Sequence, residues 1–137
     1  MKTMTKVFLA IIIFASFSAI LSAKNSDVRI DVIYFHATVR CQGCLTIEDF
    51  AKKSIDWNFK KELEKGKLTF TSIDFLQDSN AHYQDDYKFD SQTLVLSKKV
   101  GGKEVKFKIL DKIWDYSGDY EKFQKYVKDE IINFQKD

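Results

Sequence analysis

The chain has 137 residues, with 22 Lys and Arg against 20 Asp and Glu, and its formal net charge at pH 7 is +2. Lys2 and Lys6 account for this excess, so residues 24–137 are formally neutral. Nucleic-acid-binding proteins normally show a basic excess, and we therefore expect no nucleic-acid partner. Two cysteines are too few for a disulfide-stapled scaffold, and hydrophobic packing must hold the fold.

Residues 1–23 have the pattern of a secretion signal. A positively charged start precedes an almost unbroken apolar stretch, and small residues end it at Ala23, where a signal peptidase could cut. We therefore predict a signal peptide over 1–23, one domain over 24–137, and export to the bacterial periplasm. In the alternative interpretation, residues 7–23 stay attached and anchor the domain to the inner membrane. No other contact with a membrane is expected.

The first half of the domain shows a strand, a helix and a second strand. Residues 28–35 begin in alternation and end in an apolar run, as a largely buried strand does. Apolar residues recur at three- and four-residue spacing over residues 44–63, which predicts one amphipathic helix that stops at Gly66. Residues 67–75 alternate and predict the second strand. Together they form a βαβ unit, whose strands should be parallel and whose crossover should be right-handed.

The second half adds two strands and a helix. Residues 80–87 indicate a short helix, and residues 93–96 and 103–110 indicate two strands. Gly101-Gly102 between these strands is a hairpin signal, so they should pair antiparallel. Residues 120–134 predict a C-terminal amphipathic helix. The order β-α-β-α-β-β-α describes an α/β domain with a central mixed sheet flanked by helices.

Cys41-Gln42-Gly43-Cys44 contains both cysteines and lies between the first strand and the first helix. At a helix N-terminus, unpaired backbone N–H groups and the helix dipole favour a thiolate over a thiol. Cys44 follows one helical turn later and can form a disulfide with Cys41. The tetrapeptide therefore predicts a redox-active disulfide, with Cys41 as the attacking thiolate and Cys44 as the resolving thiol.

This order of elements, with CxxC at the end of the first strand, resembles the thioredoxin fold. Phe35-His36-Ala37 followed by Arg40-Cys41-Gln42-Gly43-Cys44 is similar to the segment that leads into a thioredoxin active site. Tyr34-Phe35-His36, Arg40-Cys41 and Ser91-Gln92-Thr93-Leu94-Val95-Leu96 are most similar to an exported group, the nitrophenyl compound nitroreductase subunit, ArsF family. The resemblance implies an exported thiol–disulfide oxidoreductase, or an electron-carrying subunit of a nitroreductase-type complex.

The chain departs from the thioredoxin pattern at four places, one of which is the interior of the CxxC, Gln42-Gly43 instead of Gly-Pro. Arg40 replaces the usual Trp before the first cysteine, and Tyr34 lies near the position of the family's buried Asp. The chain contains no proline, and Gln92 stands where the family has a cis-proline. A cis bond before a residue other than proline costs roughly 2.5–4 kcal/mol, so we expect a trans peptide at Gln92.

Four more residues are candidates for the site. Arg40 would add a stabilising positive charge beside the Cys41 thiolate. His36 would tune that thiolate or shuttle a proton, or it is an ordinary histidine at a loop edge. Gln92 and Thr93 would bind a substrate segment lying beside Cys41, or Gln92 merely fills the gap left by the missing proline. Both tryptophans, Trp57 and Trp114, are expected in core or edge packing and not in a binding platform.

Other uses of the two cysteines stay open at this point. An inert disulfide closing so short a loop would contribute only about 2 kcal/mol to stability. His36 and His82 could complete a zinc site, and the two thiols alone could capture a metal or metalloid. The chain could also be a scaffold subunit with a dispensable CxxC. We expect no cofactor, because no nucleotide-binding glycine loop is present. We also expect no metal, because structural zinc sites usually use a second closely spaced pair of ligands and His82 is isolated. The expected partner is a protein that donates or accepts electrons.

Overall fold

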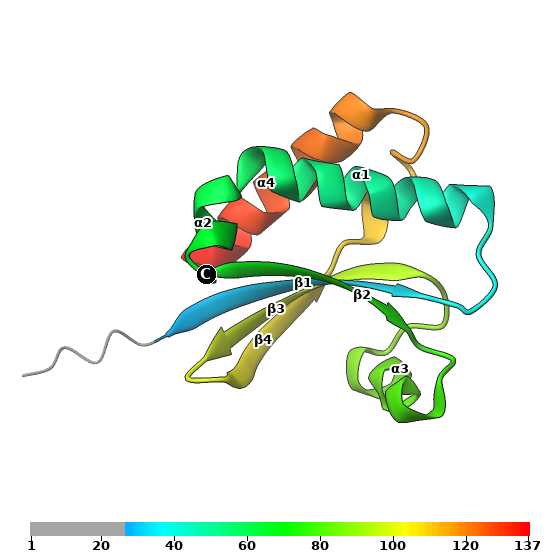
Figure 1. Cartoon of the computed structure of the whole chain (residues 1–137), viewed down its shortest axis with the longest axis horizontal. Helices are drawn as coiled ribbons and strands as arrows, with labels where there is room; N and C mark the ends of the chain where they lie inside the picture. Colours follow the sequence, from blue (N-terminus) through cyan, green and yellow to red (C-terminus); the bar gives the residue numbers. More distant parts are fainter. Residues whose placement is uncertain (1–26) are drawn as a thin grey trace, which may run out of the picture.

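The computed structural model describes residues 27–137. The predicted signal peptide, residues 1–23, and the alternative anchor, residues 7–23, lie outside the described residues. One mixed sheet forms the centre of the domain, in the order β2-β1-β3-β4 (Figure 1). Its strands are β1 (Val28–His36), β2 (Leu68–Asp74), β3 (Thr93–Val100) and β4 (Lys103–Ile109).

The strand directions confirm the predicted topology. β1 pairs with β2 in parallel and with β3 antiparallel, and β3 pairs with β4 antiparallel. The hairpin turns at Gly101 and Gly102, whose φ angles of 59° and 80° lie in the left-handed region that glycine adopts without strain.

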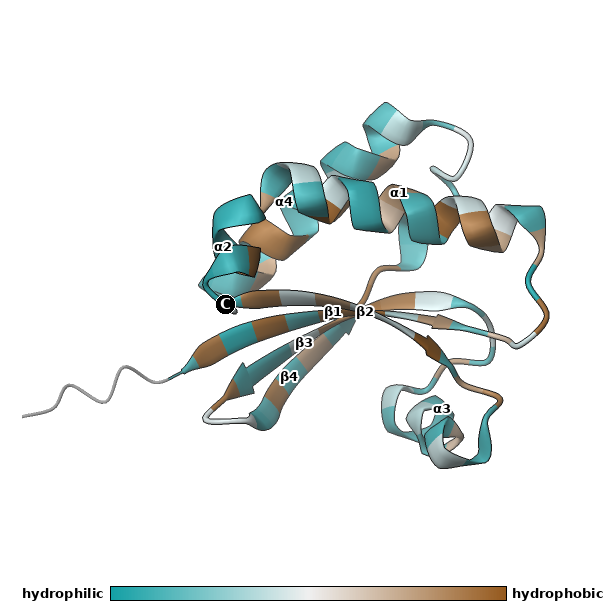
Figure 2. Cartoon of the chain, in the orientation of Figure 1, coloured by the Kyte–Doolittle hydropathy of each residue, from teal (hydrophilic) through white to brown (hydrophobic). Residues whose placement is uncertain are grey.

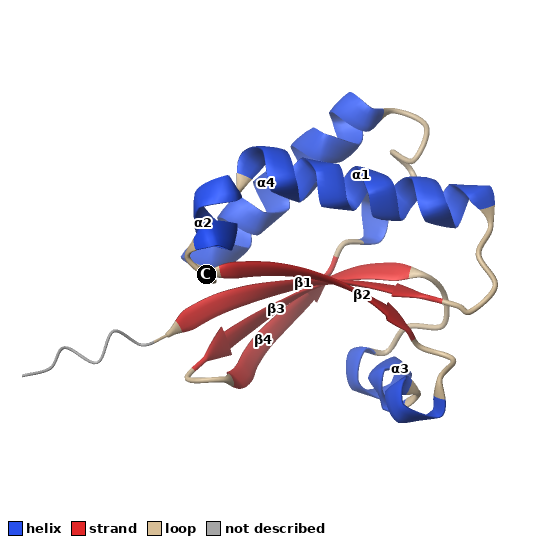
Figure 3. Ribbon diagram, in the orientation of Figure 1, coloured by secondary structure: helices blue, strands red, loops and turns tan. Residues whose placement is uncertain are grey.

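The helices cover the two faces of the sheet unequally, as Figures 1 and 3 show. On one face lie α1 (Gln42–Asn58), α2 (Lys60–Glu64) and α4 (Tyr120–Lys136), and the shorter α3 (His82–Tyr87) lies on the other. A parallel βαβ unit, an antiparallel hairpin beside its first strand and a C-terminal helix packed with α1 define a thioredoxin-like fold. Within residues 27–137, no helix is long and apolar enough to cross a membrane.

β1 contributes buried side chains to both faces of the sheet. Figure 2 shows hydrophilic and hydrophobic residues alternating along its first half. On the helix-covered face its residues pack against α1 and α4 in the main core. That core includes Ile30, Val32, Tyr34, Ile47, Ala51, Ile55, Phe123, Val127 and Ile131. On the other face, a smaller cluster holds α3 against the sheet: Ile33, Phe35, Phe75, Tyr87 and Val95. The periodic apolar residues of the two long helices therefore face the sheet, as predicted.

The single helix predicted over residues 44–63 is wrong, because the helix breaks at Phe59. Phe59 has φ −128° and ψ 29°, so α1 ends at Asn58 and α2 begins at Lys60. Two helix-type hydrogen bonds still span the break, from Phe59 N–H to the Ile55 carbonyl and from Leu63 N–H to the Phe59 carbonyl. The apolar residues therefore keep helical spacing on both sides of the break. For this reason the spacing alone does not predict the break.

Two other boundaries differ from the predictions. β3 continues to Val100, beyond the predicted end at residue 96, because its second half pairs with the start of β1. That half contains Lys98 and Lys99, so it has no apolar pattern from which a strand could be predicted. The short helix predicted over residues 80–87 is split into a 3-10 turn over Asp78–Asn80 and α3.

β4 is an edge strand with a register shift opposite Lys98 and Lys99. The pairing passes from Glu104 to Lys106 across this step, so Val105 is the extra residue of a bulge. After the bulge, Lys106 pairs with Asp137 at the end of α4, with the Lys106 Nζ and Asp137 carboxylate 3.1 Å apart. Lys108 forms a further ion pair with Glu130 of α4.

Asp31 is a buried carboxylate, 7% exposed, on the sheet face opposite α1. It accepts hydrogen bonds from Arg29 Nε at 2.6 Å and Thr69 Oγ1 at 2.8 Å, and Lys99 Nζ lies 2.9 Å away. Burial alone would raise the pKa of Asp31. The bonds from Arg29, Lys99 and Thr69 together outweigh burial and lower that pKa below its ordinary value.

We expect Asp31→Asn to reduce the free energy of unfolding by about 1–2 kcal/mol at pH 7. A carboxyl group whose folded-state pKa is lowered stabilises the fold above its unfolded pKa of about 3.9, and this contribution is lost as pH falls through the folded value. The difference from wild type should therefore shrink below about pH 3.9. Urea unfolding at pH 7 and at acid pH measures it. As a control, Asp56→Asn removes an exposed pair with Lys52 and should change stability by less than about 0.5 kcal/mol.

Candidate functional site

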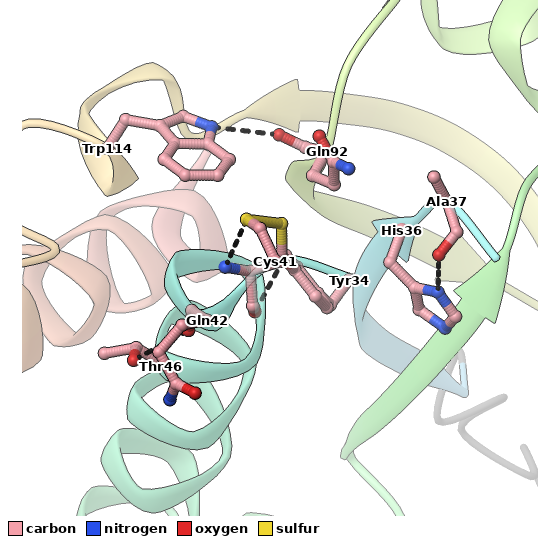
Figure 4. Close-up of a disulfide and its surroundings, with 9 residues drawn as sticks. Tyr34, His36, Ala37, Cys41, Gln42, Thr46, Gln92 and Trp114 are labelled. Atoms are coloured by element: carbon pink, nitrogen blue, oxygen red, sulfur yellow. Dashed lines mark hydrogen bonds between the residues drawn. A yellow bond between two sulfur atoms is a disulfide. The ribbon is translucent and has the colours of Figure 1, made fainter. Parts of the chain in front are cut away.

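Cys41 and Cys44 form a disulfide at the N-terminus of α1 (Figure 4). Cys41 is the N-cap residue, and its Sγ accepts a hydrogen bond from the Cys44 backbone N–H at 3.1 Å. The two Cα atoms are 5.1 Å apart, within the usual range for a disulfide. The predicted position of the first sulfur at a helix N-terminus is confirmed.

The two sulfurs differ in their exposure to solvent. Cys41 is exposed, whereas Cys44 is 2% exposed and packs in the first turn of α1. A thiolate from another molecule can therefore reach Cys41 Sγ and not Cys44 Sγ. This asymmetry is the one that sequential attack and release by two cysteines requires.

The first turn of α1 favours a negative charge on Cys41. Its N–H groups point towards the N-cap, and the Cys44 N–H already bonds to the sulfur. No acidic residue lies in this turn to oppose a thiolate. Once the disulfide is reduced, the same N–H group can stabilise the Cys41 thiolate.

The guanidinium of Arg40 is held by groups other than Cys41. Its Nη1 lies 2.6 Å from a carboxylate oxygen of Glu48 on α1, and its Nη2 donates to Ser72 Oγ on β2 at 3.2 Å. Burial raises the pKa of Glu48, but hydrogen bonds with Ser72 and Arg40 outweigh this and lower it. Glu48 compensates the charge of Arg40. Arg40 therefore stabilises a Cys41 thiolate less than an unpaired guanidinium at the same place would.

His36 ends β1 and turns towards the following loop. Its Nδ1 lies 2.9 Å from the Ala37 carbonyl oxygen, which can only accept, so Nδ1 carries a hydrogen. Figure 4 shows the ring directed towards Ala37 and not towards the disulfide. The arrangement matches the loop-edge interpretation of His36, and no hydrogen bond links it to either cysteine.

Tyr34 lies beneath the disulfide in the core. Its hydroxyl donates to the Cys44 carbonyl oxygen at 2.9 Å, which fixes the first turn of α1 against β1. Burial raises the pKa of Tyr34 to about 12, while the nearby charge of Arg40 lowers it and that of Glu48 raises it. The hydroxyl therefore stays protonated near neutral pH. Tyr34 supports the site and does not supply the proton acceptor that a buried Asp would.

Gln92 and Thr93 come to the disulfide from the start of β3. Figure 4 shows Gln92 across from Cys41, and its carbonyl oxygen accepts a hydrogen bond from Trp114 Nε1 at 3.1 Å. Thr93 is buried and pairs with Phe35 of β1. All peptide bonds of the described residues are trans, so the expectation for Gln92 is confirmed.

The prediction that both tryptophans serve in packing is wrong for Trp57 and incomplete for Trp114. Trp57 is 82% exposed, because it lies on the outer face of α1 near the end of the helix. Trp114 is 40% exposed and lies beside the disulfide. A Cβ atom added at Gly43 would be 3.7 Å from the Trp114 ring and 3.8 Å from Cys41 Sγ. Trp114 is the site residue that the sequence analysis missed, since it sits in an irregular segment without a periodic pattern.

The zinc site considered from the sequence does not form. Among residues 27–137, no group of three or more His, Cys, Asp or Glu side chains could hold a metal ion. His82 is on α3, where its Nε2 lies 3.9 Å from Asp86, and His36 bonds to its own loop. The disulfide therefore lacks the further ligands that a four-coordinate zinc would need.

Comparison with known proteins gives few matches. No family model matches the sequence, and no curated protein matches it. Among solved structures, the chain is similar to thioredoxin O2 from Arabidopsis thaliana in its oxidised state, with 14% identity, a TM-score of 0.39, and 70% of this chain and 76% of that one covered. It is also similar to a structure described as "Structure of a malarial protein", with 21% identity, a TM-score of 0.39, and 58% and 79% covered. Similarity of this extent indicates no function, and the assignment of a thioredoxin-like fold rests on the strand order.

Proposed function

We propose that this protein is an exported thiol–disulfide oxidoreductase that exchanges electrons with a partner protein through Cys41 and Cys44. One observation carries the proposal: an exposed sulfur caps a helix, and a buried sulfur stands directly behind it. The thioredoxin-like fold around this disulfide supports the same kind of chemistry. The periplasm is the proposed compartment, on the pattern of residues 1–23.

The exchange proceeds in two balanced steps. In the reduced protein, the Cys41 thiolate attacks one sulfur of a partner disulfide, forms a mixed disulfide and expels the partner's other sulfur as a thiolate. Cys44, after losing its proton to solvent, attacks Cys41 Sγ and releases the second partner thiolate. The protein is thereby oxidised by two electrons to the Cys41–Cys44 disulfide, and the partner disulfide is reduced to a dithiol. A partner dithiol drives the reverse sequence.

The test of this proposal is the pH dependence of alkylation at Cys41 in the reduced protein. Because the helix N-terminus stabilises the thiolate, we expect the midpoint of the iodoacetamide reaction to lie below about 8.5, the pKa of a free cysteine. Mass spectrometry after proteolysis separates Cys41 from Cys44. The Cys44→Ala variant is the matched control, since in it only Cys41 can react.

A parallel assay follows reduction of insulin disulfides by the protein with dithiothreitol as the electron source. We expect turnover by the wild type and none by Cys41→Ser. A midpoint near that of free cysteine together with no turnover would contradict the proposal and favour an inert disulfide.

The same pair of thiols supports a second candidate, capture of a soft metal or metalloid without turnover. The observation in its favour is that no proline ring covers the sulfurs and that Cys41 is exposed. Inactivity with insulin, combined with metal binding that Cys41→Ser abolishes, would decide for this candidate. A role as the electron-carrying subunit of a nitroreductase-type complex, as the ArsF resemblance implies, would use the same exchange with one dedicated partner.

A further inference from the structure

Trp114 stands beside the reactive sulfur without being needed to bury it. The residue follows the 3-10 turn Asp111–Ile113, and its ring lies over Gly43 in the first turn of α1. Because Gly43 has no side chain, the space between the indole and Cys41 Sγ is left open. Figure 4 shows the indole and Gln92 together on one side of the disulfide. The indole therefore lies next to one side of the exposed Cys41 sulfur.

The indole is held in one orientation. Its Nε1 donates to the Gln92 carbonyl oxygen at 3.1 Å, and the Ser117 hydroxyl donates to the Trp114 carbonyl oxygen at 2.8 Å. The preceding residue, Ile113, is fully buried in the main core and anchors the turn. A large apolar surface that is already ordered loses little entropy when a partner packs on it.

Exposed apolar residues occur before and after Cys41 in the sequence, and the charge of the residue before it is compensated. Val39, two residues before Cys41, is 86% exposed, and Leu45 of the next helical turn is also exposed. The charge of Arg40 is paired with Glu48. Exposed apolar residues around an exposed sulfur favour partner segments that are themselves apolar, and they offer no charge to recognise a small charged disulfide.

We propose that Trp114 determines the substrate specificity of this site. Its indole forms one wall of the approach to Cys41 and selects disulfides of polypeptides whose half-cystine is flanked by apolar side chains, over small hydrophilic disulfides. The inference rests on the proposed function. Aromatic side chains with a hydrogen-bonded polar atom and an exposed ring face are those that dominate the binding energy of protein interfaces.

The experiment compares three disulfides as oxidants of the reduced protein. They are the dimer of acetyl-Leu-Cys-Leu-amide, the dimer of acetyl-Ser-Cys-Ser-amide, and bis(2-hydroxyethyl) disulfide. The wild type should react with the leucine peptide about ten times faster than with the serine peptide, as one favourable apolar contact of this size provides. Trp114→Ala should remove that preference, because it slows the leucine peptide by about tenfold more than it slows bis(2-hydroxyethyl) disulfide.

Two further variants make the result specific. Trp114→Phe keeps an aromatic face and loses the bond to Gln92, so it should retain part of the preference even if Trp114→Ala folds poorly. Trp57→Ala removes the exposed tryptophan of α1 and should change no rate. An equal loss with all three disulfides, or a wild type without preference, would overturn the inference and leave the proposed function intact. A wild type that reacts with none of the three would overturn the proposed function and the inference together.

Discussion

Replacing Cys44 with alanine should turn the protein into a trap for its partner. Cys41 remains exposed at the N-terminus of α1 and can still attack a partner disulfide. The residue that releases the mixed disulfide is missing, and no other cysteine exists in the chain to replace it. A covalent adduct should therefore accumulate, and turnover with insulin should fall by several orders of magnitude, because release then depends on an external thiol.

Non-reducing electrophoresis of the Cys44→Ala protein from its native host, followed by mass spectrometry, detects the adduct and identifies the partner. Cys41→Ser is the matched control: Cys44 is buried, so this variant should form no adduct. Equal trapping by the two variants would show that the exposed sulfur has no special role. Absence of adducts from both, with insulin reduction intact in the wild type, would point to a partner that lacks a disulfide.

Replacing Phe35 with alanine should cost about 3–5 kcal/mol of the free energy of unfolding. Phe35 is fully buried in β1, and its ring centroid lies 4.9 Å from that of Phe89, 5.1 Å from Tyr83 and 5.6 Å from Tyr87. Tyr83 and Tyr87 belong to α3, and Phe89 follows it in the chain. Phe35 therefore provides much of the contact that holds this segment on the sheet. The truncation leaves a cavity and removes those aromatic contacts together.

Denaturant unfolding followed by circular dichroism measures this loss. Phe35→Leu fills more of the space and should cost clearly less than the alanine variant. Phe107→Ala, which removes an exposed ring 4.9 Å from Tyr87, should cost about 1 kcal/mol and serves as the control. A loss for Phe35→Ala no larger than that for Phe107→Ala would show that α3 does not depend on the second cluster.

Most of the fold could be predicted because its elements are amphipathic or alternating. The break at Phe59 could not, since the side chain keeps its place in the apolar spacing while the backbone leaves the helical region. The second half of β3, residues 97–100, could not be predicted for a related reason. Lys98 and Lys99 show no apolar alternation, and their strand conformation comes from pairing with the start of β1.

The disulfide could be predicted because its two cysteines lie within one tetrapeptide, whereas its other neighbours come from distant segments. The Arg40–Glu48 pair depends on how the loop meets α1, and the position of Trp114 depends on how an irregular turn packs after β4. The spacing of residues in the sequence predicts neither contact. The one sequence feature that could have indicated Trp114 as a site residue is that it lies outside any periodic apolar pattern in a chain with a CxxC.

The bulge in β4 has a consequence for behaviour at high concentration. An edge strand carries unpaired backbone groups that can template the addition of a strand from another molecule. Here the bulge at Val105 interrupts the straight run of donors and acceptors, and Lys106 and Lys108 are held in ion pairs with α4. A second molecule meeting this edge would have to pair with a distorted ladder. The irregular β4 edge therefore disfavours fibrillar self-assembly through this side of the sheet.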